Sequence, residues 1–203
     1  MLVWKVSMSS ALLRPSPDLD VPGFLEFLDR RPDERWELHQ GVPRAMVGGT
    51  MAHGTIGSNI VAALKGPARE RGCRALNGFL VQASETSSFE PDTLVVCALF
   101  DDRSRTTDRP LIVFEVLSPS TMDFDRTGKA PLYRRIPSLQ QLVFVYQDST
   151  RVESWLRRDE GWTAEPDLLL EPERSLALPS IAGSLSLIDI YADVVPYPLI
   201  PRR

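Results

Sequence analysis

The sequence predicts a mixed α/β fold, with a central sheet that helices cover on both faces. Segments 91–100 and 110–117 are apolar at nearly every position, which is typical of strands buried on both sides. Segment 51–71 instead carries apolar residues at helical spacing. Because helical and strand-like segments are interleaved along the chain, we expect them to form one mixed sheet with its flanking helices.

The N-terminal half combines short helices and strands. Residues 21–30 indicate a short amphipathic helix, and residues 35–47 indicate two short strands joined at Gly41. A longer helix is expected over 51–71, with Thr50 as its N-cap. A glycine–proline pair in the last part of that helix predicts a kink or an early end, because proline lacks the backbone N–H.

Strands dominate the second half of the chain. Each is a short apolar segment bounded by polar or turn-forming residues, and the last two are expected to pair as a hairpin. The expected strands are 79–83, 91–100, 110–117, 141–146 and 151–158.

The length of 203 residues suits one domain. We expect an α/β domain over 18–192, preceded by a flexible arm over 1–17 and followed by a tail over 193–203. No apolar run is long enough to cross a bilayer, and the N-terminal segment is a poor signal peptide. These features predict a cytoplasmic protein with no membrane partner.

Cysteine and histidine are scarce. Cys73 and Cys97 are too few for a disulfide framework, so we expect two buried free thiols in a reducing compartment. With only two histidines as well, no structural zinc site is expected. The patterns GxxxxGK, GxGxxG, GxSxG and HExxH are absent, which excludes the chemistries that they usually mark.

The net charge of the chain is -4. Proteins that hold nucleic acid by charge alone are usually basic, so any contact with nucleic acid must be local or transient. The window 123–135 is the place we expect for such a contact, since its basic residues outnumber its acidic ones.

Two acidic residues stand out because their surroundings are apolar. Asp92 opens segment 91–100, and Glu115 lies inside segment 110–117. A buried carboxylate without a partner is costly, and a metal ion is one possible partner. If the two strands are neighbours with their acidic faces aligned, both carboxylates can reach one hard cation. Mg²⁺ commonly takes one or two protein carboxylates and keeps several waters.

The spacing and context of these acids resemble a known signature. Pro91 and Asp92 are followed, after 22 intervening residues, by Glu115, Val116 and Leu117. With its surroundings, the chain resembles the Uma-type family of the PD-(D/E)XK restriction-endonuclease-like superfamily over roughly 18–192. The segments that carry the resemblance are RWELHQG (35–41), AMVGGTMAH (45–53), EPDTLVVC (90–97), FEVLSPST (114–121) and YRRIPSLQQLVFV (133–145).

The resemblance implies a restriction-endonuclease-like core, with helices around a mixed sheet, extra β-hairpins and a Mg²⁺-dependent site. Asp92 and Glu115 would be the metal ligands and catalytic carboxylates. The usual motif lysine is replaced here by Leu117, and the resemblance points to Lys129 as its substitute. A lysine there would stabilise charge on the phosphate or orient the attacking water.

Two further residues match the family. Glu37 would complete the acidic cluster, and His53 matches a recurring histidine near the start of the long helix. The acidic residue that usually follows the early glutamate motif is replaced by Gln40.

The segment around Lys129 carries conflicting signals. A helix over 123–136 would place Asp125, Lys129 and Tyr133 on one face at a spacing of four residues. Glycine at 128 and proline at 131 oppose a continuous helix. We therefore expect the helix to begin near residue 130, with Lys129 in the loop before it.

Simpler interpretations stay open for each candidate. In these interpretations Asp92 would form a hydrogen bond within a turn, Glu115 would pair with a buried arginine, and Lys129 would be a solvated surface residue. His53 would be a hydrogen-bonded residue at a helix start, and Asp125 a cap or a salt-bridge partner. Glu37 would be a surface residue paired with Arg35 or Arg44.

The leading hypothesis is a magnesium- or manganese-dependent endonuclease that hydrolyses phosphodiester bonds of DNA with an activated water. The alternative is a catalytically weak or inactive nuclease-fold module with a binding or regulatory role. By analogy with nucleases that cut two strands, we expect a homodimer.

Overall fold

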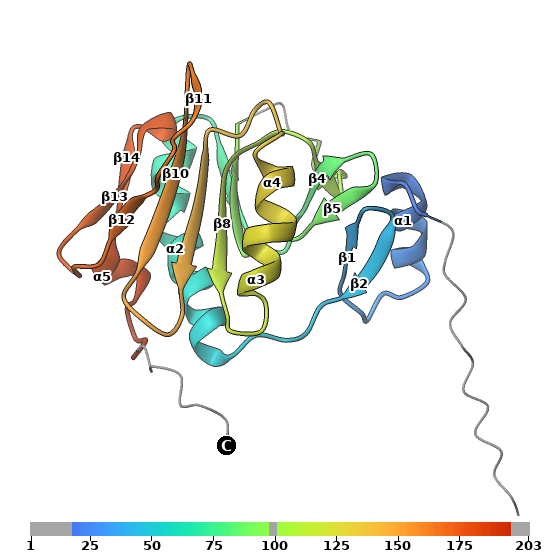
Figure 1. Cartoon of the computed structure of the whole chain (residues 1–203), viewed down its shortest axis with the longest axis horizontal. Helices are drawn as coiled ribbons and strands as arrows, with labels where there is room; N and C mark the ends of the chain where they lie inside the picture. The colour runs from blue at the N-terminus through green and yellow to red at the C-terminus, as the bar shows by residue number, and fades with distance from the viewer. Residues whose placement is uncertain (1–17, 98–100, 196–203) are drawn as a thin grey trace, which may run out of the picture.

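A seven-stranded mixed sheet forms the centre of the molecule in this computed structural model, which describes residues 18–97 and 101–195 (Figure 1). The expected N-terminal arm and most of the expected tail therefore lie outside the described residues. The strand order is β11-β10-β9-β8-β6-β3, and β12 pairs with β10. These strands are β3 (Arg74–Leu76), β6 (Thr93–Val96), β8 (Pro110–Leu117), β9 (Gln141–Tyr146), β10 (Val152–Arg158), β11 (Gly161–Trp162) and β12 (Asp167–Leu169).

The pairing pattern confirms the mixed sheet. Strands β8 and β9 are parallel, whereas β3–β6, β6–β8 and β9–β10 are antiparallel. The expected hairpin of 141–146 with 151–158 is therefore present. A parallel pair needs a crossover, which here is a helical run formed by α3 (Met122–Phe124), a π-helical turn η1 (Asp125–Lys129) and α4 (Ala130–Tyr133).

Helices cover both faces of this sheet, as the apolar strands require. Helix α2 (Met51–Glu70) packs on one face, where it meets Phe114 and Val116 of β8. The α3–α4 run packs on the opposite face, where Tyr133 meets Val113 and Leu117. Because side chains alternate along a strand, Glu115 faces the α3–α4 run together with Val113 and Leu117.

Helix α2 begins where the sequence predicts. The Thr50 hydroxyl accepts a hydrogen bond from the backbone N–H of His53 at 3.2 Å, so it caps the helix. The expected early end does not occur, since the helix continues through Pro67 to Glu70. Buried Leu64 and Ala68 in this stretch pack into the core, which supplies the contacts that hold the last turns.

A second, five-stranded sheet lies beside the first, in the order β2-β1-β5-β4-β7 (Figure 1). Its first two strands form the expected hairpin, whose turn has positive φ at Gln40 (50°) and Gly41 (82°). Such a turn matches the right-handed twist of the strands. The remaining bounds are α1 (Val21–Asp29), β1 (Trp36–His39), β2 (Val42–Ala45), β4 (Leu80–Ser84), β5 (Ser87–Phe89) and β7 (Thr106–Thr107).

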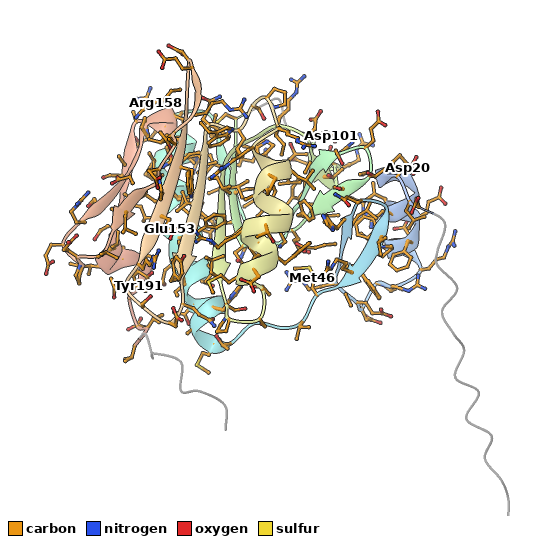
Figure 2. All side chains as sticks on the ribbon, in the orientation of Figure 1. Asp20, Met46, Asp101, Glu153, Arg158 and Tyr191 are labelled. Atoms are coloured by element: carbon orange, nitrogen blue, oxygen red, sulfur yellow. A yellow bond between two sulfur atoms is a disulfide. The ribbon has the colours of Figure 1, made fainter. Side chains whose placement is uncertain are left out.

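The C-terminal part extends the core beside α2. Its apolar side chains join the cluster that α2 forms with the central sheet. It consists of β13 (Ser175–Leu178), η2 (Pro179–Ile181), β14 (Gly183–Ser186) and α5 (Leu187–Ile190). Figure 2 shows side chains filling the space between these layers. No helix of the described residues is long and apolar enough to cross a membrane.

The expectation of two free thiols is wrong. Cys73 and Cys97 form a disulfide, with their Cα atoms 4.1 Å apart. The cause is the antiparallel pairing of β3 with β6, which sets Arg74 opposite Val96 and so brings the flanking cysteines together. The cysteines therefore no longer indicate a reducing compartment, and the cytoplasmic location stays a prediction.

Candidate functional site

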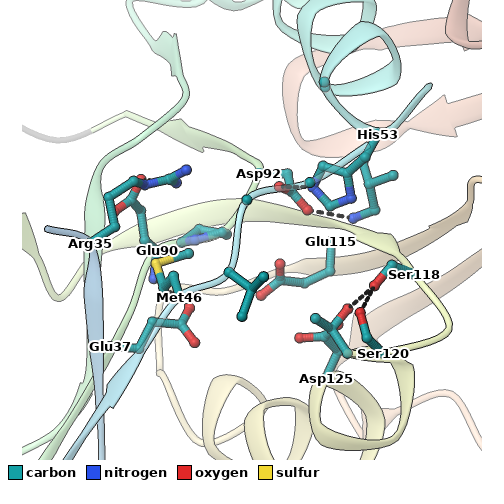
Figure 3. Close-up of a pocket in the computed structure, with 18 of the residues that line it drawn as sticks. Arg35, Glu37, Met46, His53, Glu90, Asp92, Glu115, Ser118, Ser120 and Asp125 are labelled. Carbon is teal, nitrogen blue, oxygen red and sulfur yellow. Dashed lines mark hydrogen bonds and ion pairs between the residues drawn. The ribbon is translucent and has the colours of Figure 1, made fainter. Parts of the chain in front are cut away.

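A cavity of about 770 Å³ lies where the N-terminus of α2, the ends of β6 and β8, and the α3–α4 run meet the β1–β2 hairpin. All five candidate residues from the sequence line it: Glu37, His53, Asp92, Glu115 and Lys129. Figure 3 shows their acidic side chains, together with Asp125, turned toward a shared space. The fold thus gathers residues that are far apart in the chain.

Glu115 is a deeply buried acid of the cavity, at 3% exposed. Its Oε1 accepts a hydrogen bond from the Tyr133 hydroxyl at 2.9 Å. Burial raises the pKa of Glu115 well above its usual value, although nearby Lys129 opposes this; the carboxylates of Asp125 and Asp92 raise it further. This carboxylate therefore needs a positive partner to be charged.

Lys129 is the main positive partner within the cavity. Its Nζ lies 2.8 Å from Glu37 Oε1, 3.1 Å from Asp125 Oδ1 and 3.5 Å from Glu115 Oε1. Burial alone would lower the pKa of Lys129, but the three surrounding carboxylates outweigh it and raise the pKa above its usual value. The lysine is thus a charged ammonium group, and its interpretation as a solvated side chain is wrong.

The expected position of Lys129 in a loop is also wrong. The helical run is continuous, and it accommodates the opposing residues with a π-turn in which the N–H of Ala130 donates to the carbonyl of Asp125. At Gly128, a Cβ atom would come within 2.5 Å of the Phe124 ring, so the close packing here requires glycine. Turns of this kind are frequent at functional sites.

Glu37 lies on β1 and is buried, at 5% exposed. Besides its ion pair with Lys129, it accepts a hydrogen bond from the backbone N–H of Glu90 at 3.0 Å. Burial raises the pKa of Glu37, and Lys129 partly offsets that effect. The alternative of a surface glutamate paired with Arg35 or Arg44 is therefore wrong, and Arg35 pairs instead with Glu90.

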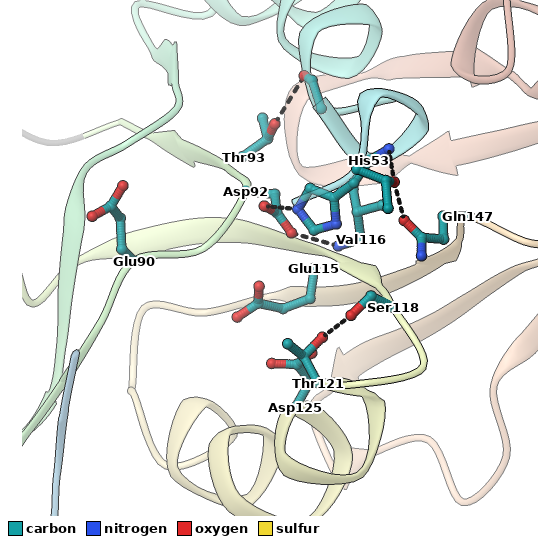
Figure 4. Close-up of polar contacts among 12 residues, drawn as sticks. His53, Glu90, Asp92, Thr93, Glu115, Val116, Ser118, Thr121, Asp125 and Gln147 are labelled. Carbon is teal, nitrogen blue, oxygen red and sulfur yellow. Dashed lines mark hydrogen bonds and ion pairs between the residues drawn. The ribbon is translucent and has the colours of Figure 1, made fainter. Parts of the chain in front are cut away.

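Asp92 precedes β6 and is held on both oxygens, as Figure 4 shows. Its Oδ1 lies 2.7 Å from His53 Nε2, and its Oδ2 accepts the backbone N–H of Val116 at 2.7 Å. Burial would lower the pKa of His53, but the bond to Asp92 outweighs it and raises the pKa. Among the described residues, His53 Nδ1 has no hydrogen-bond partner.

The donor set suits a hard divalent cation. The five carboxylates that line the cavity outnumber its three lysine and arginine side chains. All of these acids offer oxygen, which Mg²⁺ prefers. No three His, Cys, Asp or Glu side chains in the described ranges converge to hold a metal by themselves. A magnesium ion bound here would therefore use about two carboxylates and water.

Sequence reasoning did not single out every residue of the site. The spacing places Tyr133 on the face of Lys129 but assigns it no role, and no pattern singles out Gln147, which accepts a hydrogen bond from the Thr50 hydroxyl at 2.9 Å. The sequence suggests Arg44 only as an ion-pair partner of Glu37, whereas the structure places it in the lining of the cavity. The spacing of four residues from Lys129 to Tyr133 was the available signal for the tyrosine.

The mixed sheet, with paired carboxylates at neighbouring strands and a lysine beside them, places the chain among nuclease-like α/β proteins. The chain belongs to the Uma2 family, described as "Putative restriction endonuclease", whose model matches residues 21–190. This membership confirms the resemblance seen in the sequence and supports a nuclease-like function.

Relatives and a solved structure agree with this assignment. The uncharacterized protein slr1290 of Synechocystis sp. is 32% identical over 186 residues, which cover 87% of this chain and 93% of that protein. A second protein of the same organism, sll1609, is 36% identical over 84 residues, covering 39% of this chain and 48% of its own length.

The solved structure is that of a "putative nuclease belonging to DUF820" from Anabaena variabilis. It matches with a TM-score of 0.70 and 18% identity, over 86% of this chain and 98% of that one. The match confirms the mixed α/β nuclease-like fold.

Proposed function

We propose that this protein hydrolyses phosphodiester bonds of DNA, with Mg²⁺ or Mn²⁺ held by Asp92 and Glu115. The observation that carries the proposal is the position of Lys129, which lies within 3.5 Å of Glu115 although the motif position, Leu117, is a buried apolar residue. The lysine that the signature requires is thus supplied from the α3–α4 run.

Neighbouring groups orient the two metal-binding carboxylates in this proposal. His53 and the N–H of Val116 orient Asp92, while Tyr133 orients Glu115. When bound, the metal ion supplies Lewis-acid activation of a phosphoryl oxygen and lowers the pKa of a water.

Lys129, His53 and the two remaining buried acids complete the scheme. Lys129, as a charged ammonium, stabilises the charge that develops on the phosphate oxygens. Glu37 and Asp125 hold its ammonium group in place through their ion pairs. His53 contributes by holding Asp92 through Nε2, while its Nδ1 is buried and has no hydrogen-bond partner among the described residues.

The test is cleavage of plasmid DNA with Mg²⁺ or Mn²⁺. We expect Asp92→Asn and Glu115→Gln each to lower the cleavage rate by about 100-fold or more, as for loss of a group that acts in the transition state. Asp159→Asn, at an exposed position, is the matched control. Equal cleavage by wild type and Asp92→Asn would contradict the proposal.

A second candidate is a non-catalytic nuclease-fold module that acts as a homodimer. One observation favours it: both oxygens of Asp92 and the ammonium of Lys129 already have protein partners. Calorimetry with Mg²⁺ and Mn²⁺ separates the two candidates. Binding that Glu115→Gln abolishes supports the enzyme, whereas no heat with either ion supports the module.

A further inference from the structure

Arg44 differs from the other cations that line the cavity. Lys129 is buried and shared among carboxylates, and Arg35 is paired with Glu90. Arg44 is exposed, and no carboxylate of the described residues lies within ion-pair distance of its guanidinium. It is therefore the cation of the cavity whose charge stays available to a ligand.

The fold nevertheless holds Arg44 in place. It lies on β2 directly opposite Glu37 of β1, so both side chains project from the same face of the hairpin. Its guanidinium carbon lies 4.2 Å from the centre of the Phe124 ring. That ring packs edge-to-face against His39 and Phe89, with centroid distances of 5.0 Å and 6.3 Å.

The stacking leaves the hydrogen-bonding edge of the guanidinium free. An arginine has five N–H donors in a planar fork that matches phosphate oxygens. No hydrogen bond to another group in the described ranges engages these donors, and the guanidinium instead stacks on the ring of Phe124. Stacking on Phe124 thus fixes the position of the Arg44 guanidinium, while its N–H donors remain available to hydrogen-bond a ligand.

The charge of the site makes such a group necessary. The cavity concentrates carboxylates, and the whole chain carries a net charge of -4, so a polyanionic strand is repelled unless a local cation holds it. We infer that Arg44 binds a backbone phosphate of the substrate strand beside the bond that is cut. The inference rests on the proposed phosphodiester substrate and adds the residue that anchors it.

The test measures binding rather than cleavage. A fluorescently labelled oligodeoxynucleotide, single- or double-stranded, is titrated with the protein in Ca²⁺ instead of Mg²⁺, at several salt concentrations. Each phosphate contact contributes about 0.7 (single strand) to 0.9 (duplex) to the slope of log K against log[salt]. We expect Arg44→Gln to reduce the slope by that amount and to weaken binding about fivefold to eightfold at about 0.1 M salt.

Two variants complete the experiment. Arg158→Gln removes the same charge from an exposed position far from Met46 and the cavity, as Figure 2 shows, and should leave the slope unchanged. Arg44→Lys keeps the charge and should restore most of the slope, which separates a phosphate contact from damage to the stacking with Phe124.

The outcomes distinguish this inference from the proposed function. If Arg44→Gln and wild type show the same slope while wild type cleaves DNA, the inference is wrong and the function stands. If the slope falls as expected but no DNA is cleaved, Arg44 is a phosphate contact in a protein without the proposed hydrolysis. If wild type binds neither oligonucleotide, both proposals are wrong.

Discussion

At the scale of single residues, the balance of charge around Lys129 decides the state of the site. Three carboxylates lie within ion-pair distance of its ammonium, and all of these groups are buried. Removing one partner of a buried pair is far more costly than its net contribution suggests, because it leaves uncompensated charge. The lysine therefore supports both the fold and the proposed chemistry.

Lys129→Met is expected to lower the free energy of unfolding by about 3 to 5 kcal/mol at pH 8. Without the lysine, the pKa of Glu115 rises further above its usual value of 4.5, so the folded state holds protons that the unfolded state releases. By linkage, stability then falls as pH rises, and the deficit should be smaller at pH 5. Urea unfolding at both pH values measures it.

A second substitution checks the cause of that loss. Adding Glu115→Gln to Lys129→Met removes one uncompensated carboxylate and should recover part of the lost stability. An equal deficit at pH 5 and pH 8, with no recovery in the double variant, would show that packing rather than charge is responsible.

Another buried acid, Glu153, lies outside the cavity in a hydrogen-bond network of its own. It accepts hydrogen bonds from the Tyr146 hydroxyl at 2.8 Å, from Arg126 at 2.8 Å and from Arg151. Burial would raise the pKa of Glu153, but these donors outweigh it and lower the pKa below its usual value of 4.5. Since Arg126 belongs to the π-turn, this network ties the turn to β10.

A group with a lowered pKa stabilises the folded state above its usual pKa, and this contribution disappears as pH falls through the folded pKa. Glu153→Gln should therefore cost about 2 kcal/mol at pH 7. The difference in unfolding free energy between wild type and Glu153→Gln should become smaller below about pH 4.5, because the wild-type protein begins to lose the contribution of Glu153 there. Thermal unfolding between pH 7 and pH 3 tests this, with the exposed Glu160→Gln as control; a constant difference would contradict it.

At the scale of secondary-structure elements, the π-turn is what the sequence did not predict. The spacing of polar residues in this segment favours a continuous α-helix. Its glycine and proline instead favour a break before residue 130, because both oppose helices. The structure shows neither of these. One π-helical turn keeps the α3–α4 run continuous and buries both Asp125 and Lys129. The π-helical turn sets Gly128 against the ring of Phe124, a contact that the helix-opposing residues alone do not reveal.

Gly128→Ala should disturb this turn. Its Cβ would lie 2.5 Å from two Phe124 ring carbons, so the ring or the turn must shift. We expect a loss of about 1 to 3 kcal/mol, as for overpacking, together with weaker DNA cleavage. The control for stability is Gly54→Ala in α2, an exposed position where no atom beyond the chain neighbours lies within 4 Å of the new Cβ. Replacing an exposed helical glycine by alanine raises the stability of a protein by about 0.5 to 1 kcal/mol. The same increase for Gly128→Ala would contradict the proposed steric clash with Phe124.

At the scale of the whole molecule, the sequence predicted the layers better than the connections between them. Strand β8 matches its expected bounds, 110–117, because it is apolar on both faces and ends in polar residues. The acidic pair was found for the same reason, since a charge in such a strand is conspicuous. The second sheet was only partly expected, because short strands such as β5 carry no distinctive apolar pattern.

The disulfide was missed because it depends on strand pairing, which local sequence does not reveal. Between the two cysteines the chain leaves the central sheet at β3, builds β4 and β5 of the second sheet, and returns at β6. The bond therefore closes the loop that joins the two sheets beside the cavity. It also links the end of α2 to the strand that follows Asp92.

Reduction of this disulfide should destabilise the whole molecule. The cysteines are 24 residues apart, and removing a crosslink that closes a loop of this size raises the entropy of the unfolded state by the equivalent of about 3.5 kcal/mol. We expect dithiothreitol to lower the midpoint of urea unfolding of wild type, and to have no effect on Cys73→Ser/Cys97→Ser, which should unfold like reduced wild type. If dithiothreitol leaves the unfolding midpoint of wild type unchanged while thiol titration shows full reduction, the crosslink does not stabilise the fold.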